Sequence, residues 1–230
     1  LGTYQTEEEA AKAPNDPNAQ GRKKHAGDAI FEDVNNDGQL DSKDMKFMGY
    51  IRPDKVGGIV NSFKYKGLTV RVVMDWAMGH VIDNGFKGQI MGSSRNNNNA
   101  IKDAMTNSWQ SANDGTKYPK YTVQSDYDYQ YRNHMRWDNQ IGSSESGSTN
   151  NSLYFSKGDY LAFREVSLSY MLPSTWVRKI RLSGVEVFAG AYNIGYIKKY
   201  DGMFPEIYTG VDYGVYPRPR QYNMGVKINF

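Results

Sequence analysis

Cysteine and long apolar runs are both absent from this sequence of 230 residues. Without cysteine, the chain has no disulfide framework and no thiol chemistry, which fits passage through an oxidising compartment. Without a run of about 18 apolar residues, it has no candidate transmembrane helix. This second absence leaves membrane proteins built from strands open, because barrel strands are short and only half apolar.

A strong net charge and a secretory leader are missing too. The formal net charge of +3 is too small to predict a nucleic-acid partner. The sequence opens at Leu1 without a basic segment followed by an apolar one, so it predicts no signal peptide. We therefore expect either a processed chain or a piece of a longer protein.

Residue groupings that would indicate catalysis are also missing. The three histidines, His25, His80 and His134, lie far apart and lack the spacing of metal ligands. Neither a Gly-x-Ser-x-Gly elbow nor a phosphate-binding loop occurs. Acidic pairs are present, but the sequence does not place them face to face. We expect that the protein is not an enzyme.

Tyrosine and glycine are abundant in a sequence that is polar on average. It has 18 tyrosines and 23 glycines, and its mean hydropathy is −0.72. A soluble enzyme of this size would show more leucine, more alanine and more helical periodicity. The composition is instead typical of large β-barrels.

The last ten residues alternate between apolar and polar side chains. The apolar set is Tyr222, Met224, Val226, Ile228 and Phe230, and the polar set is Gln221, Asn223, Gly225, Lys227 and Asn229. Because a strand sends successive side chains to opposite faces, this segment predicts one apolar and one polar wall. Taken alone, it fits equally an outer-membrane barrel strand that ends on an aromatic residue and the edge strand of a soluble β-sandwich.

Four earlier segments also read as strands, over residues 57–65, 68–77, 159–170 and 185–197. In the second of these, Val70, Val72 and Met74 alternate with polar positions that include Arg71 and Asp75. The charged side chains would be costly in a sandwich core but not in a wet lumen. We predict that the three apolar side chains face lipid and that the two charged ones face the lumen.

The connections between these strands differ greatly in length. Long segments cover 1–50 and 78–158, whereas the turns at 66–67 and 171–183 are short. Such asymmetry is typical of an outer-membrane barrel, with long loops outside the cell and short turns in the periplasm. The chain then divides into an extracellular loop (1–50), a hairpin (56–77), a long extracellular loop (78–158) and the last three strands (159–230). Short helices are expected over 7–13 and 99–110, and Ser174 is expected to cap a helical turn.

A twelve-residue segment from Asp33 to Asp44 matches a calcium-binding loop. Its predicted oxygen ligands are Asp33, Asn35, Asp37, the Gln39 carbonyl, Asp41 and Asp44, and Gly38 stands where the loop must turn sharply. Aspartate occupies the last position, where glutamate is usual, and no strong helices flank the loop. Calcium would be a structural cofactor here. The alternative is a solvated turn rich in Asp and Asn.

Aromatic residues are scattered among polar ones in the 78–158 segment. The candidates for stacking on a sugar substrate are Trp109, Tyr127, Tyr129, Tyr131 and Trp137. The alternative, which we favour, is that they pack the loop against itself or against a covering protein.

Several segments, in this order and at this spacing, resemble the C-terminal part of the SusC/RagA family of TonB-dependent outer-membrane transporters. They are Gly27-Asp28 leading into residues 33–41, Tyr65-Lys66-Gly67-Leu68, residues 159–173, Ala191-Tyr192-Asn193-Ile194, residues 212–220 and the terminal Asn229-Phe230. No single segment is decisive, but together they span nearly the whole chain.

The resemblance implies an all-β fold, namely the last strands of an antiparallel transmembrane barrel of about 22 strands. It implies import of glycans or peptides across the outer membrane of a Gram-negative bacterium, under a SusD-like surface lipoprotein and with energy from TonB. The remaining barrel strands, outer-membrane lipid and TonB would then be partners, TonB through a part that this sequence does not contain. It also implies that Phe230 is a signal for barrel assembly.

A second reading comes from a different class of protein. A soluble extracellular β-sandwich, stabilised by calcium and binding carbohydrate, would show the same alternating strands. The two readings differ in their apolar faces, which a sandwich buries and a barrel exposes to lipid.

Overall fold

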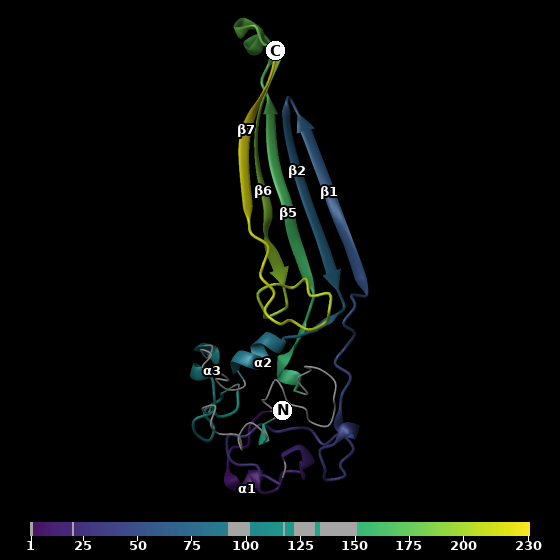
Figure 1. The fold of residues 1–230 in the computed structure, drawn as a ribbon, viewed down its shortest axis with the longest axis vertical. Coiled ribbons are helices and arrows are strands. Elements are labelled where there is room, and N and C mark those ends of the chain that lie inside the picture. The colour runs from purple at the N-terminus through teal and green to yellow at the C-terminus, as the bar shows by residue number, and fades with distance from the viewer. Residues whose placement is uncertain (1, 20, 92–101, 117, 122–131, 134–150) are drawn as a thin grey trace. The chain divides into compact units, whose positions relative to one another are not determined.

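The computed structural model describes residues 2–19, 21–91, 102–116, 118–121, 132–133 and 151–230 (Figure 1). The chain forms two compact units. The loop unit comprises residues 1–49, 83–155 and 211–214, and the sheet unit comprises residues 50–82, 156–210 and 215–230. Within the described ranges, no helix is both long enough and apolar enough to cross a membrane.

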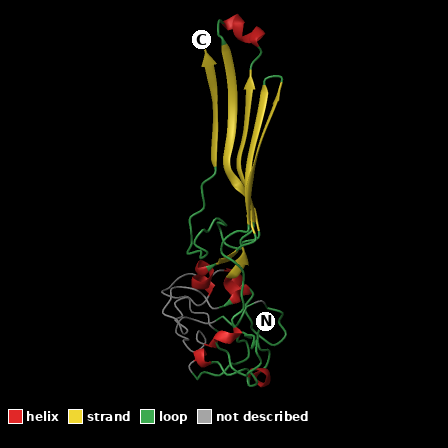
Figure 2. Cartoon of the chain, turned by 90° about the vertical axis from the view of Figure 1, so that its right-hand side faces the viewer, coloured by secondary structure: helices red, strands yellow, loops and turns green. Residues whose placement is uncertain are grey.

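The sheet unit is built on five long antiparallel strands. They are β1 (Lys55–Tyr65), β2 (Leu68–Met78), β5 (Tyr160–Met171), β6 (Gly184–Lys198) and β7 (Gln221–Asn229). They lie side by side in the order β1-β2-β5-β6-β7, as Figure 1 shows. Figure 2 shows the same strands after a turn of 90°. The predicted antiparallel all-β architecture is confirmed, and β7 pairs with β6 from Gly184 opposite Asn229 to Tyr192 opposite Gln221.

A two-residue turn joins β1 to β2. Lys66 and Gly67 both have positive φ, 44° and 86°, as in the mirror-image turns that match the twist of a hairpin. A Cβ atom at position 67 would lie 2.7 Å from the carbonyl oxygen of Met171, so only glycine fits there. The short turn therefore sets the register in which Tyr65 faces Leu68.

The registers place one set of side chains on each face of the sheet. The apolar face carries Phe63, Tyr65, Leu68, Val70, Val72, Val166, Leu168, Tyr170, Val187, Tyr222, Met224, Val226 and Ile228. Many of these remain exposed in the part of the chain that the structure describes, Met224 to 87%. A sandwich would require this face to be buried, so the arrangement favours the barrel reading.

A bulge in β5 interrupts the alternation. Val73 faces Glu165 and Met74 faces Phe163, so Arg164 has no opposite residue on β2, and the ladder with β6 shifts at the same point. Without the bulge, Arg164 would share the apolar face with Val166. The extra residue re-aims its side chain to the other face, where the guanidinium bonds Asp75.

The remaining elements are short. They are α1 (Glu7–Ala10), η1 (Pro17–Ala19), η2 (Ser42–Asp44), β3 (Val81–Asp83), α2 (Gly85–Met91), α3 (Lys102–Thr106), η4 (Ser152–Tyr154), β4 (Phe155–Lys157), α5 (Ser174–Val177) and η5 (Arg178–Ile180), with β3 paired to β4. Two helices, α1 and α3, lie within the segments predicted to be helical, whereas α2 was not predicted. The predicted cap is wrong: α5 starts after Pro173, and no side chain caps it.

Candidate functional site

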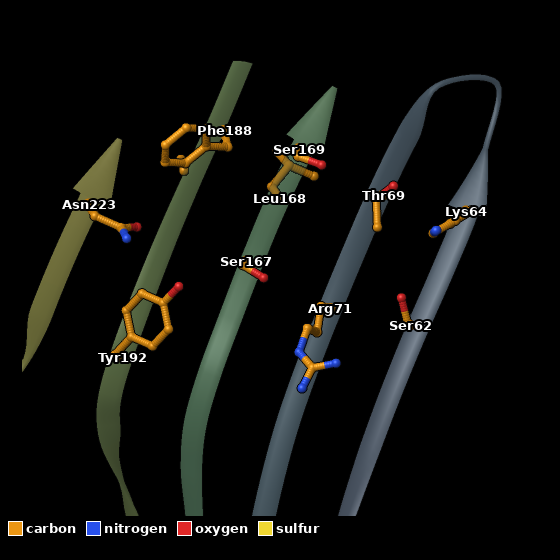
Figure 3. Close-up of a pocket in the computed structure, with 11 residues that line it drawn as sticks. Ser62, Lys64, Thr69, Arg71, Ser167, Leu168, Ser169, Phe188, Tyr192 and Asn223 are labelled. Carbon is orange, nitrogen blue, oxygen red and sulfur yellow. The ribbon is translucent and has the colours of Figure 1, made fainter. Parts of the chain in front are cut away.

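The polar face of the sheet is hollowed across all five strands. The hollow has a volume of about 380 Å³, and its lining side chains come from adjacent strands (Figure 3). They are Ser62 and Lys64 of β1, Thr69 and Arg71 of β2, Ser167, Leu168 and Ser169 of β5, Phe188, Ala189 and Tyr192 of β6, and Asn223 of β7. Most stand on the polar parity of their strands, so the strand alternation itself builds the site.

Hydroxyl and cationic groups dominate the hollow. The Nε of Arg71 lies 3.4 Å from Oε2 of Glu165, and the Ser167 hydroxyl donates to Oε1 of the same carboxylate at 2.8 Å. Among the described residues Lys64 makes no ion pair. Two cations, four hydroxyls and the ring of Tyr192 therefore face one space. Such a surface can hydrogen-bond a polyhydroxylated or carboxylate-bearing molecule.

Gly190 leaves space for two side chains of the hollow, those of Asn223 and Tyr192. A Cβ at position 190 would lie 2.6 Å from Oδ1 of Asn223 and 3.0 Å from the Tyr192 ring. Gly190 faces Asn223 in the β6–β7 ladder, so the amide and the ring approach each other over bare backbone. Any larger residue at this position would push the two side chains apart.

The predicted calcium loop folds into a series of turns closed by its own carboxylates. Asp33 accepts from the backbone N–H groups of Asp37 at 3.2 Å and Gly38 at 2.8 Å, and Gly38 has φ 81°. At the other end, Asp44 accepts from the backbone N–H groups of Val34 and Asp41, both at 2.8 Å. The two ends of the loop are thus fastened to each other.

The ammonium group of Lys43 lies 3.7 Å from the carboxylates of both Asp37 and Asp41. Among the described residues, no group of three or more acidic or imidazole side chains is disposed to hold a metal ion. The donor chemistry nevertheless fits a hard cation, because Asp33, Asn35, Asp37, Asp41 and Asp44 supply only oxygen atoms as ligands and flank a sharp turn at Gly38. Calcium binding stays a prediction.

Of the five aromatic residues predicted to stack on substrate, only Trp109 lies in the described part of the chain. Its ring packs against the backbone of Gly27, where an added Cβ would approach within 2.5 Å, and its buried indole N–H has no hydrogen-bond partner among the described residues. This position suits packing within the loop unit. Tyr127, Tyr129, Tyr131 and Trp137 lie outside the described residues.

Sequence reasoning missed a buried polar centre in the loop unit. The side chain of Asp28 is 2% exposed and accepts from Arg132 Nε, Asn133 Nδ2 and the His25 backbone N–H, all at 2.8 Å. Asn133 is fully buried and accepts in turn from the backbone N–H of Ala29. The only signal was Gly27-Asp28, which the resemblance had singled out without giving it a role.

The predicted assembly signal, Phe230, follows directly after β7 and is 93% exposed. Its neighbour Asn229 faces Gly184 and accepts a backbone hydrogen bond from Ser183 at 2.9 Å. Regular pairing therefore reaches the residue before the terminal aromatic.

Known proteins that are similar to this chain agree with the geometry of the sheet. No family model matches the chain. TonB-dependent receptor P3 of Formosa agariphila is 25% identical over 216 residues, which is 89% of this chain and 19% of the relative. The TonB-dependent receptor SusC of Bacteroides thetaiotaomicron is 26% identical over 91 residues, 39% of this chain and 9% of that protein. The chain thus spans about a fifth of the length of the receptor P3 that it matches.

Among solved structures, the RagAB peptide importer in its open-open state covers 86% of this chain with a TM-score of 0.60 and 22% identity, using 20% of its own chain. A second RagAB peptide transporter structure covers 78% with a TM-score of 0.56, 23% identity and 17% of its own chain. The resemblance to SusC/RagA-type TonB-dependent receptors is confirmed, and the fold is that of a β-barrel segment.

Proposed function

We propose that these residues form part of the barrel wall of a TonB-dependent importer in the outer membrane of a Gram-negative bacterium. The observation that carries the proposal is the sheet with one exposed apolar face and one hollowed polar face. Lipid is the solvent that suits the first face, and a wet lumen suits the second. The names of the similar proteins, which are receptors and transporters, support transport and not catalysis.

The two open edges of the sheet support the same proposal. Within the described residues, β1 and β7 each pair on one side only. In hydrocarbon an unpaired edge leaves backbone N–H and C=O groups without partners. Strands outside these 230 residues are therefore expected to continue the sheet on both sides. Phe230, beside the β7 edge, would mark the chain for barrel assembly.

The cargo would be glycans or peptides, delivered under a SusD-like surface lipoprotein and moved with energy from TonB. The hydroxyl-rich hollow with Tyr192 suits sugars, whereas Arg71 and Lys64 suit the carboxylates of peptides. The RagAB structures carry the name of a peptide importer, which supports the peptide branch for that protein. Calcium at Asp33–Asp44 would be structural.

Deletion of the gene for the complete protein tests this function. Uptake of fluorescent oligosaccharides and fluorescent peptides is compared in deleted and complemented cells, with and without a protonophore. We expect the deletion to abolish energy-dependent uptake of one class and complementation to restore it. Unchanged uptake of both classes would refute the importer.

A simpler experiment distinguishes a barrel wall from a soluble sandwich. A soluble sandwich would stay in solution without detergent, whereas a barrel wall requires detergent or lipid because its apolar face is exposed. Recovery of the complete protein in the membrane fraction, and its precipitation on detergent removal, is the expected result.

A further inference from the structure

A buried ion-pair network fastens residues 199–210, here called the strap, to the sheet. The strap follows β6, and it carries Glu206, whose side chain is only 1% exposed. Arg164 Nη1 lies 2.5 Å from Glu206 Oε1, and the Tyr196 hydroxyl donates to the same oxygen at 2.6 Å. Arg218 Nη2 lies 3.2 Å from Oε2. A single carboxylate thus holds the strap to both β5 and β6.

The strap also packs against the sheet unit through apolar side chains. Tyr200, Phe204 and Ile207 of the strap form a buried cluster with Ile82, and Tyr196 of β6 packs against it. The Phe204 and Tyr196 rings meet edge to face at 5.8 Å. A carboxylate placed here is costly unless it is paired, so the strap stays closed only while its cationic partners are engaged.

Arg164 has a second carboxylate partner within the sheet. Its Nε donates to Asp75 Oδ2 at 2.8 Å, and the other oxygen, Asp75 Oδ1, is buried without a hydrogen-bond partner in the described part of the chain. If Glu206 leaves, the fork of the guanidinium can engage both Asp75 oxygens. Arg164 would therefore remain paired with a carboxylate even if the strap were released, which would allow a two-state element.

We propose that the strap is a conformational latch, closed when Arg164 is shared by Glu206 and Asp75, and open when Asp75 alone holds it. Glu206 stabilises the closed state and Asp75 the open state. Neutralising the two carboxylates should therefore move the latch in opposite directions. A merely structural network would loosen whichever member was removed.

Thiol labelling measures the opening directly, since these residues contain no native cysteine. The reporter is Ile207→Cys, at a position that is 5% exposed, and the accessible control is Met203→Cys, at a position that is 59% exposed. Each is introduced into the complete protein in outer membranes, and the rate of reaction with a soluble maleimide is measured. The labelling rate at position 203 measures access of the reagent and should not change when the latch opens.

We expect Glu206→Gln to speed labelling at position 207 by about tenfold or more, because a charged hydrogen-bond partner of two arginines is lost. Asp75→Asn should slow it, because the open state loses the carboxylate that holds Arg164. Glu165→Gln, the same change at a carboxylate of β5 outside the latch, should have no effect. Labelling that is raised by Asp75→Asn, or not raised by Glu206→Gln, would overturn the proposal.

If Glu206→Gln does not assemble, a milder variant tests the latch. Arg218 is half exposed, contacts Glu206 through Oε2 and lies over the Phe204 ring, so Arg218→Gln should weaken the closed strap while leaving assembly intact. We expect it to speed labelling at position 207 about twofold to fivefold, with no change at position 203. No increase in labelling at position 207 would overturn the latch.

Discussion

Asp28 shows what a single residue does in the loop unit. Its buried carboxylate pairs with Arg132 at 2.8 Å, so removal of its charge leaves a cation with little water around it. We predict that Asp28→Asn lowers the free energy of unfolding by about 3–5 kcal/mol, measured by denaturant titration in detergent.

The exposed pair Glu32–Lys46 supplies the matched control for this measurement. Its side chains are 42% and 53% exposed, so Glu32→Gln should change the free energy of unfolding by at most about 1 kcal/mol. Equal losses of unfolding free energy in the two variants would show that the buried Asp28 stabilises the fold no more than an exposed ion pair does.

His80 gives the chain a dependence on pH. Burial lowers the pKa of its imidazole, and the nearby carboxylate of Asp159, itself paired with Lys199, opposes that shift. A group whose pKa is lower in the folded state contributes stability above its unfolded pKa, and this contribution is lost as pH falls through the folded pKa.

The backbone N–H of Gly158 reports this loss, because it donates to the His80 carbonyl at 2.8 Å. We predict that, after correction for the intrinsic pH dependence of exchange, its protection against hydrogen exchange falls as the pH drops below about 6.5. In His80→Gln the protection should no longer follow pH in that range. An identical pH profile in both proteins would contradict the assignment to His80.

At the scale of elements, alternation predicted the strands well. The strand predicted over 68–77 runs from Leu68 to Met78, and the strand predicted over 159–170 runs from Tyr160 to Met171. Local pattern suffices there because one register puts every apolar side chain on one face. It fails at Arg164, since a bulge depends on both neighbouring strands and leaves no trace in the alternation of one.

The polar centres escaped prediction for a related reason. Asp28 meets Asn133 across about a hundred residues of sequence, and Arg164 meets Glu206 across the β5–β6 hairpin. The sequence contains 25 acidic residues, and nothing in it indicates which of them pairs with a distant cation. The calcium loop could be predicted from the sequence, because all its candidate donors fall within twelve residues.

Calcium addition tests that loop. We predict that one calcium ion binds and protects residues 33–44 from proteolysis, and that Asp37→Asn weakens binding about tenfold or more, as seen by calorimetry. Asp114→Asn is the matched control, because Asp114 closes another turn by accepting from Gln110 and Thr116. Absence of calcium uptake, or ligand oxygens beyond about 2.6 Å from the ion, would refute the site.

At the scale of the whole molecule, the barrel-wall proposal requires a strand from outside these residues to pair with the open edge of β7. Phe230 lies at the end of that open edge and is fully accessible. We predict that deletion of Phe230, or Phe230→Asp, reduces the amount of complete protein in the outer membrane more than Asn229→Ala does, as measured by membrane fractionation. Normal amounts of the complete protein in the outer membrane without Phe230 would show that Phe230 is not needed for assembly.

We propose that one face of the whole sheet meets lipid and that the other meets water. Nitroxide labels on single cysteines test it in the complete protein in membranes. The first set is Val70→Cys, Val166→Cys and Met224→Cys, and the second is Thr69→Cys, Ser167→Cys and Asn223→Cys, one pair for each of β2, β5 and β7. Oxygen concentrates in lipid, whereas a charged nickel complex stays in water.

We predict that labels of the first set collide mainly with oxygen and that those of the second set collide mainly with the nickel complex, on all three strands. Protection of the first set from both reagents would mean that the apolar face is buried as in a sandwich, and would contradict the barrel-wall account.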